Sequence, residues 1–196
     1  MYTIRVTRLL AHLAFGGLGI GGLAMTPAMA QATKAADTVM VGGAPMYPSK
    51  NIIENAVNSK DHTTLVAAVK AAGLVDTLEG KGPFTVFAPT NEAFAKLPAG
   101  TVDTLLKPEN KPTLVKILTY HVVSGNYTAA DLMQMVKAGG GKATLKTVEG
   151  EPLTLTEKGT KLFISGDKSG VAEVTISNVK QSNGVIHVIN SVVLPT

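Results

Sequence analysis

The chain has 196 residues, a formal net charge of +4 and no cysteine. The absence of cysteine excludes disulfide bonds, thiol catalysis and cysteine-ligated metal sites, so packing must carry the stability of the fold. The lysines are scattered, without a basic run or interleaved aromatic residues, which argues against a nucleic-acid-binding surface.

The first thirty residues have the pattern of a cleavable signal peptide. Arg5 and Arg8 give a positive start, residues 9–24 are apolar and glycine-rich, and the Ala-Met-Ala at residues 28–30 suits a small-x-small cleavage site. The apolar run is shorter than the ~20 residues that span a bilayer. We therefore expect a secreted protein, periplasmic or extracellular, with no transmembrane segment and a net charge of +2 after cleavage.

Residues 31–49 follow without a clear hydrophobic period. Two glycines and two prolines interrupt them, namely Gly42, Gly43, Pro45 and Pro48. Because such residues interrupt regular elements, we expect a flexible leader here, with packing of residues 45–48 along the domain as the alternative. The folded domain is then expected over residues 50–196.

Helical patterns occupy much of the first half of this domain. Apolar stripes predict two helices. The first begins near Asn51, and the second begins near residue 61 with Asp61 as its cap. Gly73 is the expected end of the second helix. Residues 84–88 are aromatic and β-branched and predict a short buried strand, after which Thr90 is expected to cap a short helix.

Two further helices are predicted between residues 110 and 139. Asn110 and Pro112 suit the start of the first, whose apolar stripe extends to His121. Thr128 and Asp131 suit a capping box at the start of the second. The first half of the domain is therefore predominantly helical.

After residue 141 the hydrophobic period changes to two, as expected of strands. The alternating apolar positions are Leu153 and Leu155, Leu162 and Ile164, and Ala172, Val174 and Ile176. Asn183-Gly184 predicts a hairpin turn, and residues 185–194 predict a strand buried on both faces. Helices are thus expected mainly in the first half of the domain and strands in the second, which predicts an α+β domain. The strand at residues 84–88 is expected to join the later sheet.

The sequence shows no constellation for catalysis. It contains neither G-x-S-x-G nor H-E-x-x-H, and the histidines beyond the signal peptide, His62, His121 and His187, are widely separated. The carboxylates of Glu149 and Glu151 lie in a predicted turn and are expected to be solvated charges. We therefore expect a protein that is not an enzyme and has no catalytic residues, metal ligands or cofactor.

Three segments resemble signatures of the fasciclin-like domain family. They are residues 84–94 (FTVFAPTNEAF), residues 183–195 (NGVIHVINSVVLP) and, between them, Tyr120-His121. The resemblance covers residues 51–196 and implies that family's fold, a wedge of two β-sheets with helices packed around it. It also implies a secreted or surface module for adhesion and matrix contact. Asn190 stands where the family often carries Asp, which leaves an amide able to donate as well as accept.

The same resemblance makes Tyr120-His121 the candidate for partner binding. In animal members this dipeptide, set between bulky aliphatic residues, is implicated in integrin-type adhesion. Here the aliphatic flanks are Leu118, Val122 and Val123. The alternative is structural, because His121 lies on the apolar stripe of its helix, where its ring can bond carbonyls of the last turn. For His187 we expect a core position with hydrogen bonds across the sheet.

Two functions are consistent with these expectations. The first is an exported, non-enzymatic interaction module whose partner is a protein or polysaccharide at a cell surface or matrix, with weak self-association as an additional contact. The alternative is a periplasmic binding protein for a small apolar ligand held in the wedge between the sheets. Phe84, Phe87 and Phe94 motivate this alternative, and ordinary core packing explains them equally well.

Overall fold

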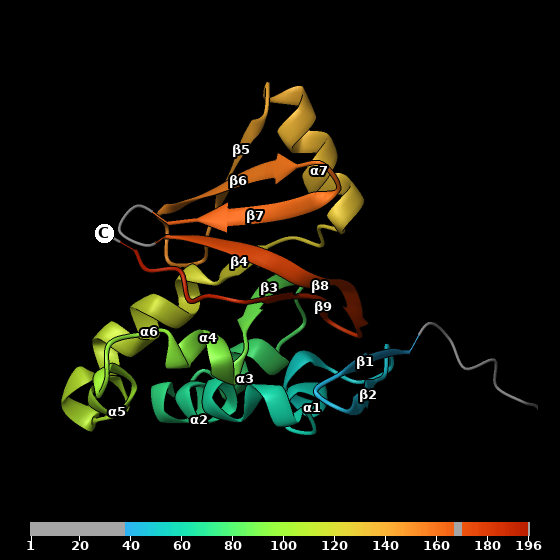
Figure 1. The fold of residues 1–196 in the computed structure, drawn as a ribbon. Helices are drawn as coiled ribbons and strands as arrows, with labels where there is room; N and C mark the ends of the chain where they lie inside the picture. The colour runs from blue at the N-terminus through green and yellow to red at the C-terminus, as the bar shows by residue number, and fades with distance from the viewer. Residues whose placement is uncertain (1–37, 167–169, 196) are drawn as a thin grey trace, which may run out of the picture. The chain divides into compact units, whose positions relative to one another are not determined.

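The structure is a computed structural model that describes residues 38–166 and 170–195 (Figure 1). The predicted signal peptide and residues 31–37 of the predicted leader lie outside the described residues. Within the described ranges, no helix has both the length and the apolar character needed to cross a membrane.

The N-terminal end of the described chain forms a hairpin instead of a flexible leader. Its strands, β1 (Val39–Val41) and β2 (Ala44–Met46), pair in antiparallel fashion. The hairpin is packed against the domain, because Val41, Ala44 and Met46 are buried. Tyr47 also exchanges two hydrogen bonds with the Asn55 side chain, at 3.0 and 2.8 Å. Strands of three residues are too short for the sequence period to reveal.

Most helices lie between residues 52 and 120, and one follows later. They are α1 (Ile52–Ala56), α2 (Thr63–Ala72), α3 (Val75–Glu79), α4 (Asn91–Ala95), α5 (Thr101–Leu105), α6 (Lys111–Tyr120) and α7 (Ala129–Ala138). Short 3-10 turns at Lys60–His62 and Pro108–Asn110 precede α2 and α6.

Local capping signals predicted several helix ends correctly. Thr90 caps α4 by accepting from the N–H of Ala93, and Thr128 forms the predicted capping box with Asp131 at α7. Gly73 ends α2 with a φ of 73°, a left-handed conformation that glycine adopts without strain. The prediction for Asp61 was wrong, since that residue lies inside the 3-10 turn before α2.

The remaining strands form one seven-stranded sheet in the order β4-β3-β9-β8-β7-β6-β5. Their bounds are β3 (Phe84–Pro89), β4 (Val122–Ser124), β5 (Lys142–Lys146), β6 (Pro152–Lys158), β7 (Lys161–Ser165), β8 (Val171–Gln181) and β9 (Gly184–Ile189). β3 and β9 are parallel, and all other pairs are antiparallel. The early strand thus joins the later sheet, and the α+β fold class is confirmed.

The sheet nearly closes on itself. An isolated bridge joins Val123 of β4 to Thr147 just after β5, and the N–H of Val148 donates to the carbonyl of Val122 at 2.7 Å. The sheet has two parts, β4-β3-β9 and β7-β6-β5, and β8 joins them. It pairs with β7 at one end and with β9 at the other. The register of β8 against β9 shifts on both sides of Ile176, near the point where β8 passes from one part of the sheet to the other.

The C-terminal signature differs in two details from its prediction. The turn consists of Ser182 and Asn183, and Gly184 already begins β9. Glycine is needed there because a Cβ atom would lie 2.0 Å from the carbonyl oxygen of Phe84 on β3. The strand ends at Ile189 instead of residue 194, and Val193 is buried without belonging to a strand.

Two hydrophobic cores lie on the two faces of β3 and β9. The helical core contains the hairpin, helices α1–α6, and Val86, Ala88, Ile186 and Val188 from these strands. The sheet core contains Phe87 and Ile189 together with α7 and β5–β8. Figure 1 shows the corresponding arrangement, with α1–α6 gathered beside β3 and α7 alone against β5 and β6. Alternate residues of a strand point to opposite faces, so one strand pair serves both cores.

Candidate interaction site

All five residues predicted to bind a partner are buried. The exposed fractions are 0% for Tyr120, 2% for Val123, 3% for His121, 4% for Leu118 and 5% for Val122. A direct contact would require these side chains to leave the interior. Their role in binding therefore stays a prediction, and the structure shows what else they do.

Tyr120 joins the last turn of α6 to the sheet. Its hydroxyl donates to the carbonyl of Pro152 at the start of β6, with an O···O distance of 2.8 Å. Its ring lies in the sheet core, whereas Leu118 and Val122 lie in the helical core. The segment thus crosses from one core to the other and ties them together.

His121 connects three segments of the chain. Its Nε2 accepts from the N–H of Val193 at 3.1 Å, so Nδ1 must carry the proton, which it donates to the carbonyl of Ile117 at 2.8 Å. Its own carbonyl accepts from the N–H of Phe87 in β3. Burial lowers the pKa of His121 to about 4, so the ring is neutral at pH 7. The predicted bond to a last-turn carbonyl is confirmed.

The other two described histidines are also interior residues. His187 lies 2.9 Å from the carbonyl of Tyr127 through Nε2 and stacks on Phe87 with ring centroids 5.6 Å apart. This confirms the predicted core position. His62 contacts the Ser59 hydroxyl through Nδ1 at 2.9 Å. Burial lowers the pKa of both His62 and His187, which keeps the rings neutral. Among the described residues, no three His, Asp or Glu side chains gather as a metal site.

A small cavity of about 40 Å³ lies inside the helical core. Its walls are mostly aliphatic and include Val41 and Met46 of the hairpin, with His62 and His121 as polar neighbours. Pockets for drug-sized ligands measure ~300–1,000 Å³, whereas a cavity of this size holds little more than water. The cavity is therefore too small for the ligand of the predicted binding protein.

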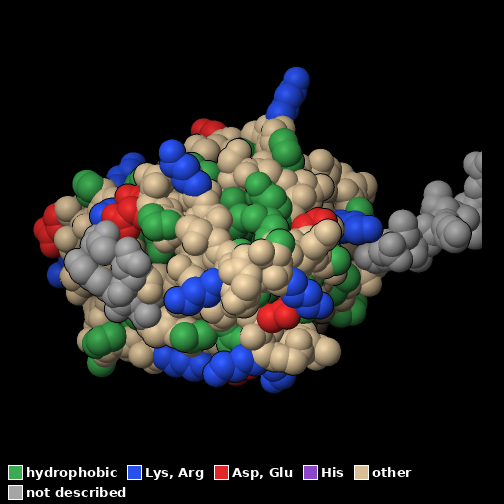
Figure 2. All heavy atoms as spheres, turned by 90° about the horizontal axis from the view of Figure 1, so that it is seen from above, with side chains coloured by type: hydrophobic (Ala, Val, Ile, Leu, Met, Phe, Trp, Pro, Cys, Tyr) green, Lys and Arg blue, Asp and Glu red, His purple; other side chains and the backbone are tan. Residues whose placement is uncertain are grey.

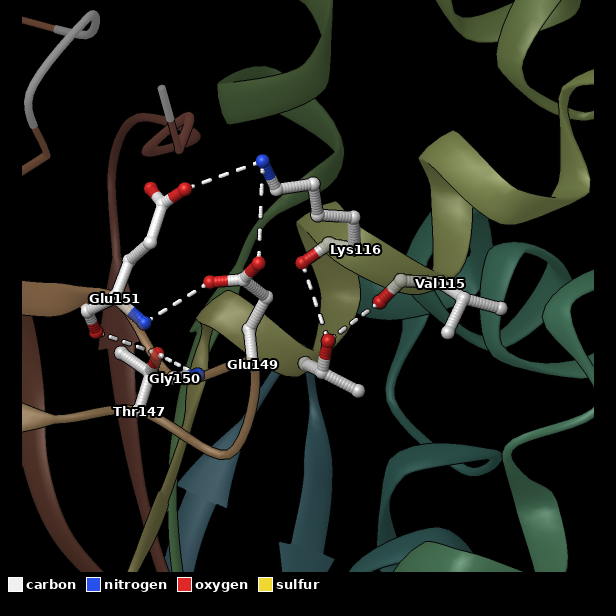
Figure 3. A network of polar contacts seen from close by, with 7 residues as sticks. Val115, Lys116, Thr147, Glu149, Gly150 and Glu151 are labelled. Carbon is white, nitrogen blue, oxygen red and sulfur yellow. Dashed lines mark hydrogen bonds and ion pairs between the residues drawn. The ribbon is translucent and has the colours of Figure 1, made fainter.

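A polar network fastens the turn between β5 and β6 to α6 (Figure 3). Lys116 Nζ lies 3.1 Å from Glu151 and 3.9 Å from Glu149, and Glu149 also accepts from the N–H of Glu151 at 3.0 Å. Thr147 closes the turn by donating to the carbonyl of Glu151. The expectation of solvated carboxylates was wrong, because their lysine partner comes from a helix more than thirty residues earlier.

The outer surface carries charges without a continuous basic region on the face seen in Figure 2. The lysine side chains there are interspersed with acidic, hydrophobic and other groups. A dispersed pattern is consistent with the scattered lysines of the sequence. On this face, an electrostatic interaction site would be a local one, built from a few residues.

Comparisons with known proteins agree with the sequence signatures. The Fasciclin domain family matches residues 60–195, a range that contains all three signature segments. Protein sll1483 of Synechocystis sp. is 47% identical over 188 residues, which cover 96% of each chain. Immunogenic protein MPB70 of Mycobacterium bovis is 34% identical over 211 residues, with coverage of 98% of this chain and 99% of that protein.

A solved structure has the same fold at low sequence identity. It is the FAS1 domain pair from the insect cell adhesion molecule fasciclin I, with a TM-score of 0.65 and 20% identity. The match covers 74% of this chain and 51% of that one. The predicted wedge with surrounding helices is confirmed at the level of the fold.

Proposed function

Because the chain belongs to the Fasciclin domain family, we propose that it is an exported, non-enzymatic interaction module for cell adhesion or for contact with a surface or matrix. The observation that carries the proposal is the extent of the match, since a single Fasciclin domain accounts for residues 60–195. The solved neighbour with this fold is itself described as a cell adhesion molecule.

The interior of the domain favours binding over catalysis. The buried His121 and His187 are neutral and bond backbone carbonyls within the fold, Ile117 for His121 and Tyr127 for His187. A general acid or base needs access to its substrate, which these rings lack. The module therefore acts through its outer surface, where several copies strengthen individually weak contacts.

The location that we propose is the periplasm or the extracellular space. It rests on the basic start, the apolar run and the Ala-Met-Ala site of residues 1–30. The mass of the protein recovered from the culture supernatant or periplasm tests it directly. A polypeptide beginning at Gln31 is expected, and recovery of the uncleaved chain in the cytoplasmic fraction would contradict export.

The alternative, a binding protein for a small apolar ligand, gains no support from the cavity in the helical core. That cavity measures about 40 Å³, and the hairpin residues Val41 and Met46 form part of its wall. Ligand binding there would require the surrounding helices and the hairpin to move apart, because a drug-sized ligand needs ~300 Å³ or more. We therefore keep adhesion as the proposed function.

The experiment compares surface attachment of the producing cells with and without the gene. The deletion strain is complemented either with the full chain or with residues 31–196 alone, which lack the export signal. We expect attachment to fall on deletion and to return only with the full chain. Unchanged attachment in the deletion strain would refute the adhesion proposal, and rescue by the unexported form would refute the surface location.

A further inference from the structure

A hollow of about 410 Å³ opens on the surface where β6, β7 and β8 meet the segment after β9. The side chains used in the argument below are Lys96, Thr156, Lys158, Phe163, Glu173, Asn190 and Ser191. They come from the end of α4, from three neighbouring strands and from the C-terminal segment. The hollow is thus formed by the tertiary structure and is not apparent in any one stretch of sequence.

The floor of the hollow is the sheet face that points away from the sheet core. Thr156, Phe163 and Glu173 are directly paired across β6, β7 and β8. Their sequence neighbours Leu155, Leu162 and Ala172 are buried in the sheet core, so this row lies on the opposite face. Phe163 is half-buried in that row and presents an aromatic surface to the hollow.

Two ammonium groups of the hollow have no acidic partner among residues 38–166 and 170–195. Glu173 is paired with Lys161 at 2.6 Å. In contrast, Lys96 and Lys158 form no ion pair with any carboxylate of the described residues. Lys96 is held in place because its Nζ donates to the carbonyl of Asn190 at 2.6 Å and lies 3.4 Å from the Ser191 hydroxyl. The local field therefore favours an anion.

Neutral polar groups surround these two charges. Asn190 Oδ1 accepts from the N–H of Glu173 at 2.9 Å, which directs the amide and leaves its NH2 group to donate elsewhere. The hydroxyls of Thr156 and Ser191 can both donate and accept. Groups of this kind suit a ligand that carries many hydroxyls, and an aromatic ring suits the apolar face of a sugar.

From this combination we infer that the hollow binds a carboxylated saccharide, such as one or two uronic acid units of an acidic polysaccharide. The carboxylate pairs with Lys96 and Lys158, the sugar hydroxyls bond Thr156, Asn190 and Ser191, and the ring lies against Phe163. An acidic peptide would use the two lysines but would leave the hydroxyl and amide groups without a matching partner. The inference rests on the proposed function, because it names the class of partner for adhesion.

The test is a titration of the exported protein with tetragalacturonate, followed by amide NMR shifts. The fully methyl-esterified tetramer serves as the uncharged control, and tetraglutamate serves as the acidic peptide. We expect the acid tetramer to shift the amides of Phe163, Glu173 and Ser191, and binding to weaken as salt is added. Shifts elsewhere, or equal binding of the ester or of tetraglutamate, would overturn the inference.

Matched variants locate the contact. Because exposed charge pairs are weak, Lys158→Gln should lower the affinity about two- to fivefold. Lys107→Gln changes an exposed lysine outside the hollow and should leave the affinity unchanged. Thr156→Val should weaken tetragalacturonate without affecting the peptide. Equal losses in both lysine variants would show a diffuse charge effect and would refute a site in the hollow.

The attachment assay separates this inference from the proposed function. If the deletion strain loses attachment but tetragalacturonate does not shift the hollow, the saccharide site is refuted and adhesion stands. If the hollow binds the tetramer while the deletion strain attaches normally, the site stands and adhesion is refuted. The deletion strain can also be complemented with the Lys158→Gln variant and tested in low salt and in 0.5 M salt. Full attachment in both conditions would count against the hollow as the adhesive contact.

Discussion

The two cores of this domain share a strand pair but differ in how they are packed. The sheet core contains one helix, α7, and most of the largest fully buried side chains, including Tyr120, Phe87 and Leu132. The helical core joins a hairpin to six helices, four of them only five residues long, and retains a cavity of about 40 Å³. Alternating strand residues bury one face completely, whereas several short helices meeting at different angles leave space between them.

Tyr120 tests the contrast most strongly, because it links the two cores. Tyr120→Ala should lower the free energy of unfolding by about 3–5 kcal/mol, since it leaves a void in the tightly packed sheet core. Tyr120→Phe keeps the ring but removes the hydroxyl that bonds Pro152, and should lower the free energy of unfolding by about 1 kcal/mol. Urea denaturation of both variants measures this difference. Equal losses would mean that the hydroxyl, and not the ring, holds the cores together.

His121 tests the helical core through its pH dependence. Its pKa is lowered by burial to about 4 in the folded state and is ~6.5 unfolded. Between these pH values the unfolded chain binds more protons, so stability falls as pH drops from about 6.5 to 4, by about 3 kcal/mol from this residue. Lowered pKa values of His62 and His187 act in the same direction.

The measurement is the free energy of unfolding at a series of pH values, for the wild type and for His121→Asn. The variant is expected to be less stable at neutral pH but to show a shallower slope between pH 6.5 and 4. The slope of the free energy of unfolding against pH is the informative quantity, since any substitution of a buried residue changes that free energy at every pH. An unchanged slope would show that His121 does not titrate on unfolding.

Two conservative enlargements compare the packing directly. Val69→Ile adds a methyl group at the wall of the cavity and should raise stability by about 0.5–1 kcal/mol. Val136→Ile adds the same group in the sheet core, where Val136 is fully buried, and should lower stability by about 1 kcal/mol or more. Both sites lie within helices, so helix propensity cancels. Thermal or urea unfolding gives the two signs, and identical signs would contradict the packing difference.

The ion pairs between α6 and the β5–β6 turn should give the smallest effect. Lys116→Met removes the contacts to Glu149 and Glu151, which are partly exposed, and should lower stability by less than about 1 kcal/mol. The difference from the wild type should shrink further in 1 M NaCl because salt screens such pairs. A large loss that persists in salt would instead assign the stabilisation to packing of the lysine stem.

Local chemistry made several elements predictable from the sequence. Thr90, Gly73 and the Thr128–Asp131 box end or begin their helices as predicted, since a cap depends on residues within one turn. The strands β6 and β7 were also predictable, because the apolar residues that alternate in their sequences are the ones buried in the structure. The family signatures also led to the correct fold class, because they combine strand, cap and turn signals in a fixed order.

The tertiary structure decided what depends on distant partners. The hairpin at residues 39–46 is ordered by burial against the helical core, and the register of β8 shifts because that strand must pair with β9 as well as β7. Tyr120 and His121 are interior links whose partners, Pro152 and Val193, lie 32 and 72 residues away. The sequence alone determined the elements and their order. Only folding brought together the side chains of the surface hollow, because they come from separate strands, the end of α4 and the C-terminal segment.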